Sequence, residues 1–221
     1  MPSLSRDGDV FVLDLGSDEN RFTPDWLEGV ERRLDEVLAA EPRALVTTAT
    51  GKFFSNGLDL EGLGQNPEGL APYVRRVHAL FARLLTFPAP TVAAMQGHVF
   101  AAGAMLALAH DWRVMRADRG YFCLPEVDIQ IPFTPGMDAL IRCKLTPSTA
   151  IDAMTTGRRY GGGDALAAGI VDEAVDESDV VPRAVERVRP LAGKDSRTLG
   201  VIKQRMFAGV VRELLEGELG F

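Results

Sequence analysis

Short apolar segments alternate with longer amphipathic ones through the first two thirds of the chain. The short segments are rich in Val, Phe and Thr and are bounded by Gly, Pro or polar residues, a pattern typical of β-strands. They cover residues 10–15, 43–49, 91–95, 112–116, 121–124 and 169–175. Strands separated by helical segments predict an α/β core.

The amphipathic segments predict helices, and some of these have clear start signals. Thr23 precedes Pro24, which places a capping hydroxyl before a proline at the first helical position, and the same Thr-Pro pair recurs at residue 146. Apolar residues at helical spacing predict a further helix within residues 73–84. Residues 101–109 are almost entirely apolar, so we expect that helix to lie in the core.

The remaining segments predict loops in the middle of the chain and helices at its end. Residues 61–69 are polar and glycine-rich and predict a mobile loop, while residues 125–133 lie between prolines and predict an extended turn. From Val180 onward the pattern is helical. One face of a single last helix is predicted from five apolar residues, Leu199, Ile202, Met206, Val210 and Leu214. The fold class is therefore an α/β core with a helical C-terminal tail.

Length and charge limit the classes of function. The chain has 221 residues, which suits one domain with a sizeable core, or one domain plus a C-terminal extension. With 24 Lys and Arg against 31 Asp and Glu, the formal net charge is −7. This acidic balance argues against a protein that coats nucleic acid or an anionic membrane. Any anionic ligand must instead be held by a local basic patch.

The cysteines and the apolar runs favour a reducing compartment. Cys123 and Cys143 have no spacing typical of zinc sites or disulfide frameworks. No stretch approaches roughly 18 uninterrupted apolar residues, and the first residues lack a basic start followed by an apolar run. We therefore expect no membrane span and no secretion signal, and a cytoplasmic location.

A first candidate segment for chemistry is the turn FSNGLDL at residues 54–60. Gly57 permits a tight turn in which the N–H of Asn56 or of Leu58 could point outward as a hydrogen-bond donor. The alternative is an ordinary turn between a strand and a loop, in which Asp59 accepts hydrogen bonds from backbone N–H groups.

A second candidate is QGHVFAAG at residues 96–103, which leads into the apolar helix. Small residues there let a ligand approach the N–H groups of the first turn, although they suit close helix packing equally well. One donor here and one near Gly57 would form a site for a negatively charged oxygen. Loss of one such donor typically raises the barrier of the catalysed step by about 2.7–4 kcal/mol.

A third candidate is Glu126, which follows the apolar residues Phe122, Cys123 and Leu124. Apolar surroundings raise the proton affinity of a carboxylate toward the range of a general base. The alternative is a solvated or ion-paired glutamate at the end of a strand. Asp128 would share the face of Glu126 if the segment stays extended, and it is the weaker candidate.

Other catalytic motifs are poorly supported. His98 has no Ser or Cys at a spacing that would form a nucleophilic triad, so it is interpreted as structural. The sequence contains no HExxH pattern, and neither a complete phosphate-binding loop nor GxGxxG after a strand. Metal-dependent chemistry, nucleotide hydrolysis and nicotinamide binding are therefore not expected.

Four segments, taken together and in this order, resemble the enoyl-CoA hydratase/isomerase family, also called the crotonase superfamily. They are GKFFSNGLDL, QGHVFAAGAMLALAHD, LPEVDIQIPF and GIVDEAV. The resemblance runs from Val10 to about Val175 and is strongest to the small plant-type Δ3,Δ2-enoyl-CoA isomerases. It implies a crotonase-like ββα spiral core at residues 1–178 and a C-terminal helical segment at residues 179–221 that serves trimerisation or covers the site.

The resemblance also implies roles for individual residues. The N–H of Ala102 and an N–H of the 56–58 turn, from Asn56 or Leu58, would form the oxyanion hole, and Glu126 would be the catalytic acid/base. Hydratases carry a second glutamate where this sequence has Met105. Since water addition uses two carboxylates and a double-bond shift needs one, the resemblance implies conversion of 3-enoyl-CoA to trans-2-enoyl-CoA in fatty-acid beta-oxidation.

Alternative functions within this resemblance are an enoyl-CoA hydratase, another thioester enzyme such as a hydrolase or decarboxylase, and a non-catalytic acyl-CoA-binding protein. The expected partners are an acyl-CoA substrate and further copies of the chain, as a homotrimer or a dimer of trimers. No cofactor is expected, because coenzyme A is part of the substrate. Further substrate contacts are expected from Ser55, Gly57, Asp59, Leu60, Gly103, Met105 and Phe133, and coenzyme A contacts from Arg21 and Lys203.

Overall fold

Repeated strand–strand–helix units build the core of this computed structural model, which describes residues 1–41, 43–64 and 69–220. The first strands of these units are β3 (Ala44–Thr48), β5 (Thr91–Met95) and β7 (Trp112–Arg116). The second strands are β4 (Phe53–Ser55), β6 (His98–Phe100) and β8 (Phe122–Cys123). Each pair is followed by helix: α2 (Leu60–Gly64) and α3 (Leu70–Leu85), then α4 (Ala102–Leu108), then α5 (Glu126–Ile129).

Two sheets result from this repetition. The first strands pair in parallel within a six-stranded sheet of order β1-β2-β3-β5-β7-β9, and the second strands form the three-stranded sheet β4-β6-β8. The other members of the larger sheet are β1 (Ser3–Asp7), β2 (Val10–Asp14) and β9 (Glu173–Val175), and β1 pairs with β2 antiparallel. This arrangement confirms the predicted ββα spiral.

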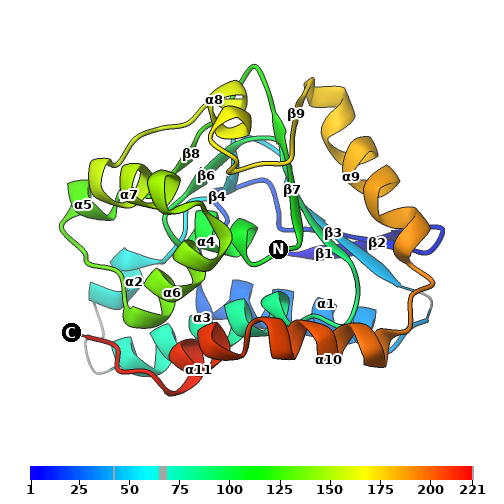
Figure 1. Ribbon diagram of the computed structural model, residues 1–221, viewed down its shortest axis with the longest axis horizontal. Helices are drawn as coiled ribbons and strands as arrows, with labels where there is room; N and C mark the ends of the chain where they lie inside the picture. Colours follow the sequence, from blue (N-terminus) through cyan, green and yellow to red (C-terminus); the bar gives the residue numbers. More distant parts are fainter. Residues whose placement is uncertain (42, 65–68, 221) are drawn as a thin grey trace.

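Alternate residues of the larger sheet pack into two different apolar clusters. Leu45 packs toward the main core, with α1 (Pro24–Leu38) and α3, whereas Val46 packs against α9 (Val180–Val188). Figure 1 shows α9 on one side of the sheet, with α1 and α3 below it. Helices on both faces explain why β3 and β5 are buried along their whole length.

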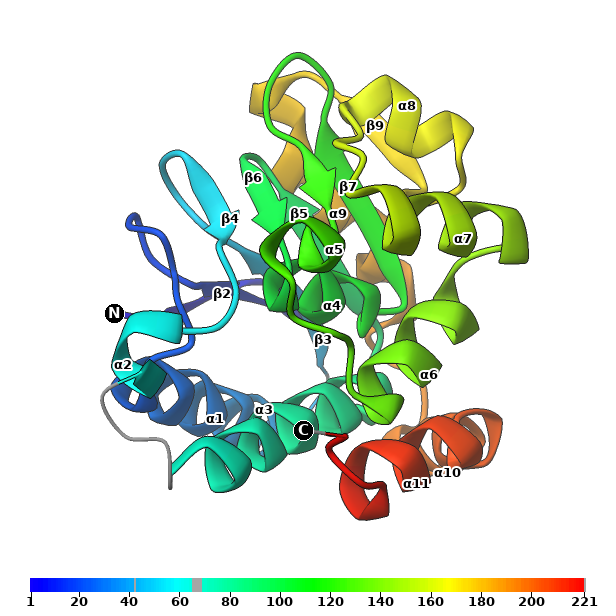
Figure 2. The same cartoon turned by 90° about the vertical axis from the view of Figure 1, so that its left-hand side faces the viewer.

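The remaining helices lie outside the two sheets, and of these α6 packs against α4. They are α6 (Pro135–Lys144), α7 (Pro147–Thr156), α8 (Gly162–Ala167), α10 (Ser196–Met206) and α11 (Ala208–Glu216). Helix α11 packs against α3 and α6. Figure 2 shows α2 and α3 on one side and α4, α5 and α6 on the other. The proposed domain boundary between residues 178 and 179 stays a prediction.

Several predicted elements differ from the structure. Within the 125–133 segment, residues 126–129 form the short helix α5 instead of an extended turn. Pro125 precedes this helix with φ of −85°, and the helix ends at Gln130, whose φ of 59° is left-handed. The expected loop at 61–69 is a short helix at its start, while residues 65–68 lie outside the described residues. Strands β1, β4 and β6 and helix α6 were not predicted, although Thr134 and Pro135, at the start of α6, carry the same start signal as Thr23 and Pro24.

The predicted last helix is two helices rather than one. The chain leaves helical geometry at Phe207, where φ is −106° and ψ is 14°, and the Phe207 ring is buried. This break lets α11 turn Leu214 into the core against α3 and α6, while Ile202 and Met206 on α10 stay exposed. A periodic apolar pattern continues across the break, which explains the error.

Candidate active site

A cavity of about 200 Å³ collects residues from four separated parts of the sequence. It lies among the segment before α1, the turn after β4, the start of α4, and the segment that runs from α5 to the start of α6. Seven residues that the sequence singled out line it: Arg21, Asn56, Leu58, Leu60, Ala102, Met105 and Glu126. The other lining residues are mainly apolar: Phe100, Ala101, Pro125, Ile129, Ile131, Pro132 and Met137.

The turn after β4 leaves the Leu58 amide open. The Asn56 N–H donates to the Glu19 carbonyl oxygen at 2.8 Å, and the Gly57 N–H donates to Ser55 Oγ at 3.1 Å. Within the described residues, no protein atom accepts a hydrogen bond from the Leu58 N–H. Of the two alternatives from the sequence, Asn56 is therefore already engaged, and Leu58 is the free donor.

The start of α4 provides a second open amide beside this turn. Ala101 has φ of 51° and Ala102 begins the helix, so the Ala102 N–H has no partner within its own helix, nor elsewhere in the described part of the chain. Gly57 has φ of 81°, and a methyl group added there would lie 2.9 Å from the Ala102 nitrogen. The turn and the helix start are thus in close contact, and both Leu58 and Ala102 line the same cavity.

Glu126 is the first residue of α5 and is 6% exposed. Its Oε2 atom is buried and finds no hydrogen-bond partner among the described residues. Burial raises the pKa of this carboxyl to about 7, because the ionised form loses solvation. This places the proton affinity of Glu126 where a carboxylate can act as a general base near neutral pH.

Asp128 does not share the face of Glu126. The segment is helical, and the Asp128 carboxylate lies against Gly157, where an added methyl group would be 2.3 Å from Oδ2. Asp128 does not line the cavity. Asp128 was a candidate base only if this segment were extended, and the segment is helical instead.

Five predicted substrate contacts, including Gly57 in the turn described above, support the cavity or lie next to it, but do not line it. Ser55 is buried and its Oγ donates to the Asn20 carbonyl oxygen. Asp59 donates its N–H to the Tyr73 hydroxyl. Gly103 lets α4 approach β4, since an added methyl group would lie 2.5 Å from the Ser55 carbonyl oxygen. Phe133 lines an adjoining groove, which shares Glu126 with the cavity.

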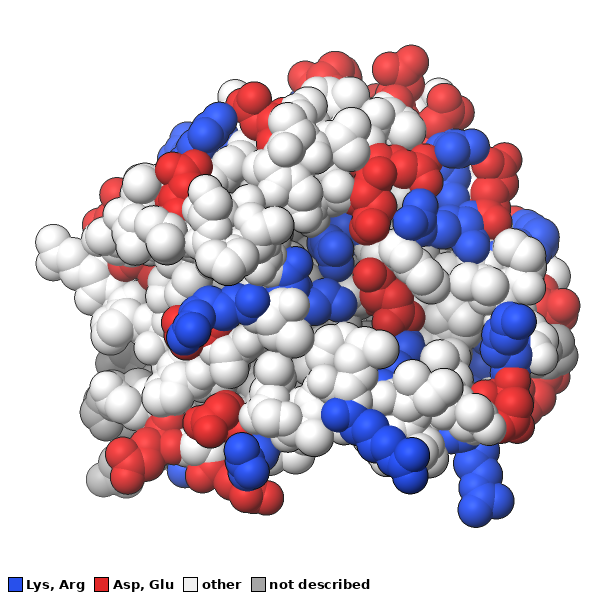
Figure 3. All heavy atoms as spheres, in the orientation of Figure 1, with Lys and Arg blue, Asp and Glu red and all other residues white. Residues whose placement is uncertain are grey.

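Lys203 does not line the cavity, and its contact with coenzyme A stays a prediction. Its side chain is buried, and Nζ donates to Asp111 Oδ2 at 2.6 Å and to the Ala89 carbonyl oxygen at 2.8 Å. It lines a separate groove of about 700 Å³, together with Lys144, that shares no lining residue with the cavity. Figure 3 shows Lys and Arg side chains gathered near the middle of one face, between the α6 and α10 regions of Figure 1.

Arg21 places a cation at the cavity. Its Nε donates to Glu19 Oε2 at 2.6 Å, and this hydrogen bond is the main reason that the pKa of Glu19 is lowered. Both side chains are partly exposed, so an anionic ligand could compete for Arg21. Among the predicted basic contacts, Arg21 is the one that remains at the cavity.

The sequence did not single out Tyr73, Ile129 or Met137 for the site. Ile129 and Met137 line the cavity, and Tyr73 contacts the turn that carries Leu58. Tyr73 appeared as one apolar position of a helix, and a helical pattern does not reveal which loop a side chain will meet.

No group of His, Cys, Asp and Glu side chains in the described residues could hold a metal ion. No helix of the described chain is long and apolar enough to cross a membrane.

The raised pKa of Glu126 predicts a pH-dependent cost to folding. The ordinary pKa is 4.5 and the folded-state pKa is about 7, so the folded chain binds this proton more tightly, and its stability falls as pH rises between these values. Relative to Glu126→Gln, which cannot ionise, the wild type should lose about 3 kcal/mol of unfolding free energy between pH 4 and pH 8. Urea denaturation of both proteins across this range measures the difference in their unfolding free energies. A difference that does not change with pH would contradict a buried Glu126 with a raised pKa.

Comparison with known proteins identifies relatives across most of the chain. A family model described as enoyl-CoA hydratase/isomerase matches residues 18–218. Enoyl-CoA delta isomerase 2, peroxisomal, of Arabidopsis thaliana is 38% identical over 207 residues, covering 88% of this chain and 86% of the relative. A carnitinyl-CoA dehydratase of Shigella flexneri is 31% identical over 163 residues, covering 73% of this chain and 61% of that protein.

Solved structures share the fold. An enoyl-CoA isomerase of Mycobacterium tuberculosis superposes with a TM-score of 0.88 at 28% identity, covering 98% of this chain and 95% of that one. The human mitochondrial delta3-delta2-enoyl-CoA isomerase gives a TM-score of 0.90 at 23% identity, covering 97% and 86% of the two chains. At that identity the human structure shows a common fold and no more.

The cytoplasmic location predicted from the sequence is wrong by this comparison. Two of the Arabidopsis thaliana relatives are named peroxisomal, and this finding overturns the prediction. The prediction rested on cysteine spacing and on the lack of a secretion signal. Neither observation distinguishes a reducing cytoplasm from an organelle whose address is read by a receptor.

Proposed function

The chain belongs to the enoyl-CoA hydratase/isomerase family, and from this premise we propose that it shifts the double bond of a 3-enoyl-CoA to the trans-2 position. The observation that carries this proposal is the cavity's single acid. Glu126 is the one carboxylate among its described lining residues, and the apolar Met105 stands where a hydratase has a second glutamate. The arrangement therefore supports proton transfer by one group rather than the two-carboxylate handling of water.

The proposed reaction begins with the thioester carbonyl between two backbone donors. The N–H groups of Leu58 and Ala102 would hold this oxygen, and the Glu126 carboxylate would take a proton from C2. Charge would then develop on the thioester oxygen of a dienolate, where fixed N–H donors stabilise it most effectively. The protonated Glu126 would return the proton at C4, which moves the double bond and restores the carboxylate.

The apolar lining supports this sequence of steps in two ways. Met105 and Met137 limit access of water, which disfavours hydration of the product. The same lining raises the pKa of Glu126 to about 7, so that the group can both accept and return a proton near neutral pH. The proposed chemistry needs a base and two N–H donors, and thus no cofactor beyond the coenzyme A of the substrate.

Arg21 is our proposed contact for the phosphates of coenzyme A, since it is the basic side chain that lines the cavity. We also propose a homotrimer or a dimer of trimers acting in fatty-acid beta-oxidation. Such an assembly would cover exposed apolar side chains, among them Ile151 at 66% exposure. Native mass spectrometry distinguishes three, six and one copies.

The direct test of the proposed function compares two reactions in one enzyme preparation. Conversion of 3-enoyl-CoA to trans-2-enoyl-CoA should be faster than hydration of trans-2-enoyl-CoA. Faster hydration would overturn the proposal in favour of a hydratase. Release of free coenzyme A thiol would indicate a hydrolase, and acyl-CoA binding without turnover of any thioester would indicate a non-catalytic binding protein.

A further inference from the structure

The hydroxyl of Tyr73 joins two backbone segments next to the cavity without lining the cavity itself. Tyr73 lies in the first turns of α3, and its hydroxyl donates to the Phe22 carbonyl oxygen at 2.8 Å. The same oxygen accepts the Asp59 N–H at 3.1 Å. One hydroxyl therefore connects the segment before α1 to the turn after β4.

These contacts fix the peptide groups on both sides of Leu58. The Gly57 carbonyl and the Leu58 N–H belong to one planar trans peptide and point in opposite directions. Because the Phe22 N–H donates to the Gly57 carbonyl oxygen at 2.9 Å, the Leu58 N–H must point away from Phe22. The next peptide group contains the Asp59 N–H, which Tyr73 holds.

The hydrogen bonds form a closed circuit. It runs from the Phe22 N–H to Gly57, along the chain to Asp59, through the Tyr73 hydroxyl, and back to the Phe22 carbonyl. Both flanking peptides of Leu58 are members of this circuit, whereas the Leu58 N–H is free. Such a support fixes a donor in place before substrate arrives, which is how an oxyanion site gains most of its effect.

We propose that Tyr73 is a positioning residue that holds the Leu58 N–H in the direction required for the substrate oxygen. This inference rests on the proposed function, since it assigns Tyr73 to the oxyanion site of the isomerase. Tyr73 does not line the cavity and acts through the turn that it holds. Burial raises the pKa of Tyr73 to about 12, so its hydroxyl keeps the proton that it donates to Phe22 throughout the working pH range.

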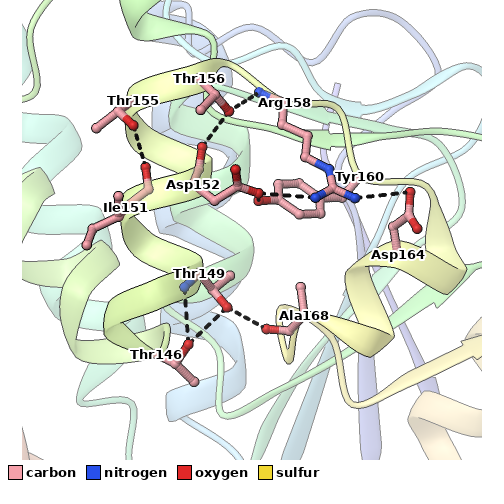
Figure 4. A network of polar contacts seen from close by, with 10 residues as sticks. All are labelled: Thr146, Thr149, Ile151, Asp152, Thr155, Thr156, Arg158, Tyr160, Asp164 and Ala168. Atoms are coloured by element: carbon pink, nitrogen blue, oxygen red, sulfur yellow. Dashed lines mark hydrogen bonds and ion pairs between the residues drawn. The ribbon is translucent and has the colours of Figure 1, made fainter.

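The test compares Tyr73→Phe with a matched control, Tyr160→Phe. The Tyr160 hydroxyl is also bonded within the protein, to Asp152 Oδ2 at 2.5 Å, in the network between α7 and α8 shown in Figure 4. Tyr73→Phe should lower kcat for isomerisation about 10-fold and change KM less than about 2-fold, because a displaced donor weakens transition-state stabilisation. Tyr160→Phe should leave both constants near the wild-type values.

A spectroscopic measurement separates positioning from a general structural role. The infrared carbonyl stretch of bound hexanoyl-CoA, isotopically labelled at the thioester carbonyl, should shift to lower frequency in the wild type because two N–H groups polarise it. The shift should be smaller in Tyr73→Phe and unchanged in Tyr160→Phe. A Tyr73→Phe enzyme with wild-type kcat, or with the full carbonyl shift, would overturn the proposal.

Two further results keep the proposal distinguishable from the proposed function and from simple misfolding. A wild type without isomerase activity would refute the function, whatever Tyr73 does. Amide hydrogen exchange on the wild type needs no variant: the Asp59 N–H should be protected in the free enzyme, and the Leu58 N–H should become protected when hexanoyl-CoA binds. Rapid exchange of the Asp59 amide in both states would overturn the role of Tyr73.

Discussion

Glu126→Gln is expected to lower isomerase turnover about 1000-fold or more, within the range that general acid–base catalysis contributes. Glutamine keeps the size of the side chain but cannot accept the C2 proton, so the dienolate does not form. The two backbone donors and the apolar lining remain, and acyl-CoA affinity should therefore stay close to that of the wild type. Steady-state kinetics with 3-enoyl-CoA, together with calorimetric titration of a saturated acyl-CoA, measure the two effects separately.

Asp128→Asn is the matched control for this variant. It makes the same carboxyl-to-amide change two residues away, on a side chain that lies against Gly157 outside the cavity. We expect its turnover to stay within a few-fold of the wild type. If Asp128→Asn were the inactive variant and Glu126→Gln the active one, the assignment of the base would be wrong.

Gly57→Ala is expected to reduce kcat/KM about 100-fold, comparable to removal of one oxyanion donor. The added methyl group would lie 2.9 Å from the Ala102 nitrogen and 3.1 Å from the Phe100 carbonyl oxygen, so the turn and the start of α4 must separate. Separation moves the Leu58 and Ala102 N–H groups out of register with one substrate oxygen. Stability should also fall by roughly 1–2 kcal/mol, because φ of 81° is unfavourable for alanine.

Gly169→Ala separates the steric effect from the backbone strain. Gly169 has a similar φ of 70°, but an added methyl group would meet no heavy atom within 4 Å in the described part of the chain. This variant should show a loss of thermal stability without a loss of activity. If both variants lost activity equally, the lost activity of Gly57→Ala would be due to destabilisation and not to displacement of the Ala102 N–H.

The alternation of short apolar runs with amphipathic segments predicted an α/β core, whereas the ββα spiral came from the resemblance to a known family. The local pattern did not predict strands β4 and β6 of the smaller sheet. The pairing of the 56–58 turn with Ala102 likewise came from the resemblance, because the glycines and small residues of both segments suit ordinary turns and close helix packing equally well. Their order along the chain resembled a known family. The features that the local pattern did not predict depend on contacts with residues distant in sequence.

Three residues show why the rest was out of reach. The choice between Asn56 and Leu58 depends on the Glu19 carbonyl, which occupies the Asn56 N–H. Lys203 has the sequence features of an exposed helical lysine, yet its side chain is buried and hydrogen-bonded to Asp111. Helical periodicity does not reveal this pairing. Tyr73 reaches two loops from a helix that looks purely amphipathic.

Proton exchange at C2 tests the central claim most directly, because it detects abstraction by Glu126 whatever step follows. In deuterated buffer, nuclear magnetic resonance should show the wild type exchanging the C2 protons of bound acyl-CoA thioesters, with a rate that rises with pH through a midpoint near 7. Glu126→Gln should bind the same thioesters without exchange. Binding by the wild type with no exchange at C2, or exchange by Glu126→Gln at the wild-type rate, would contradict the account.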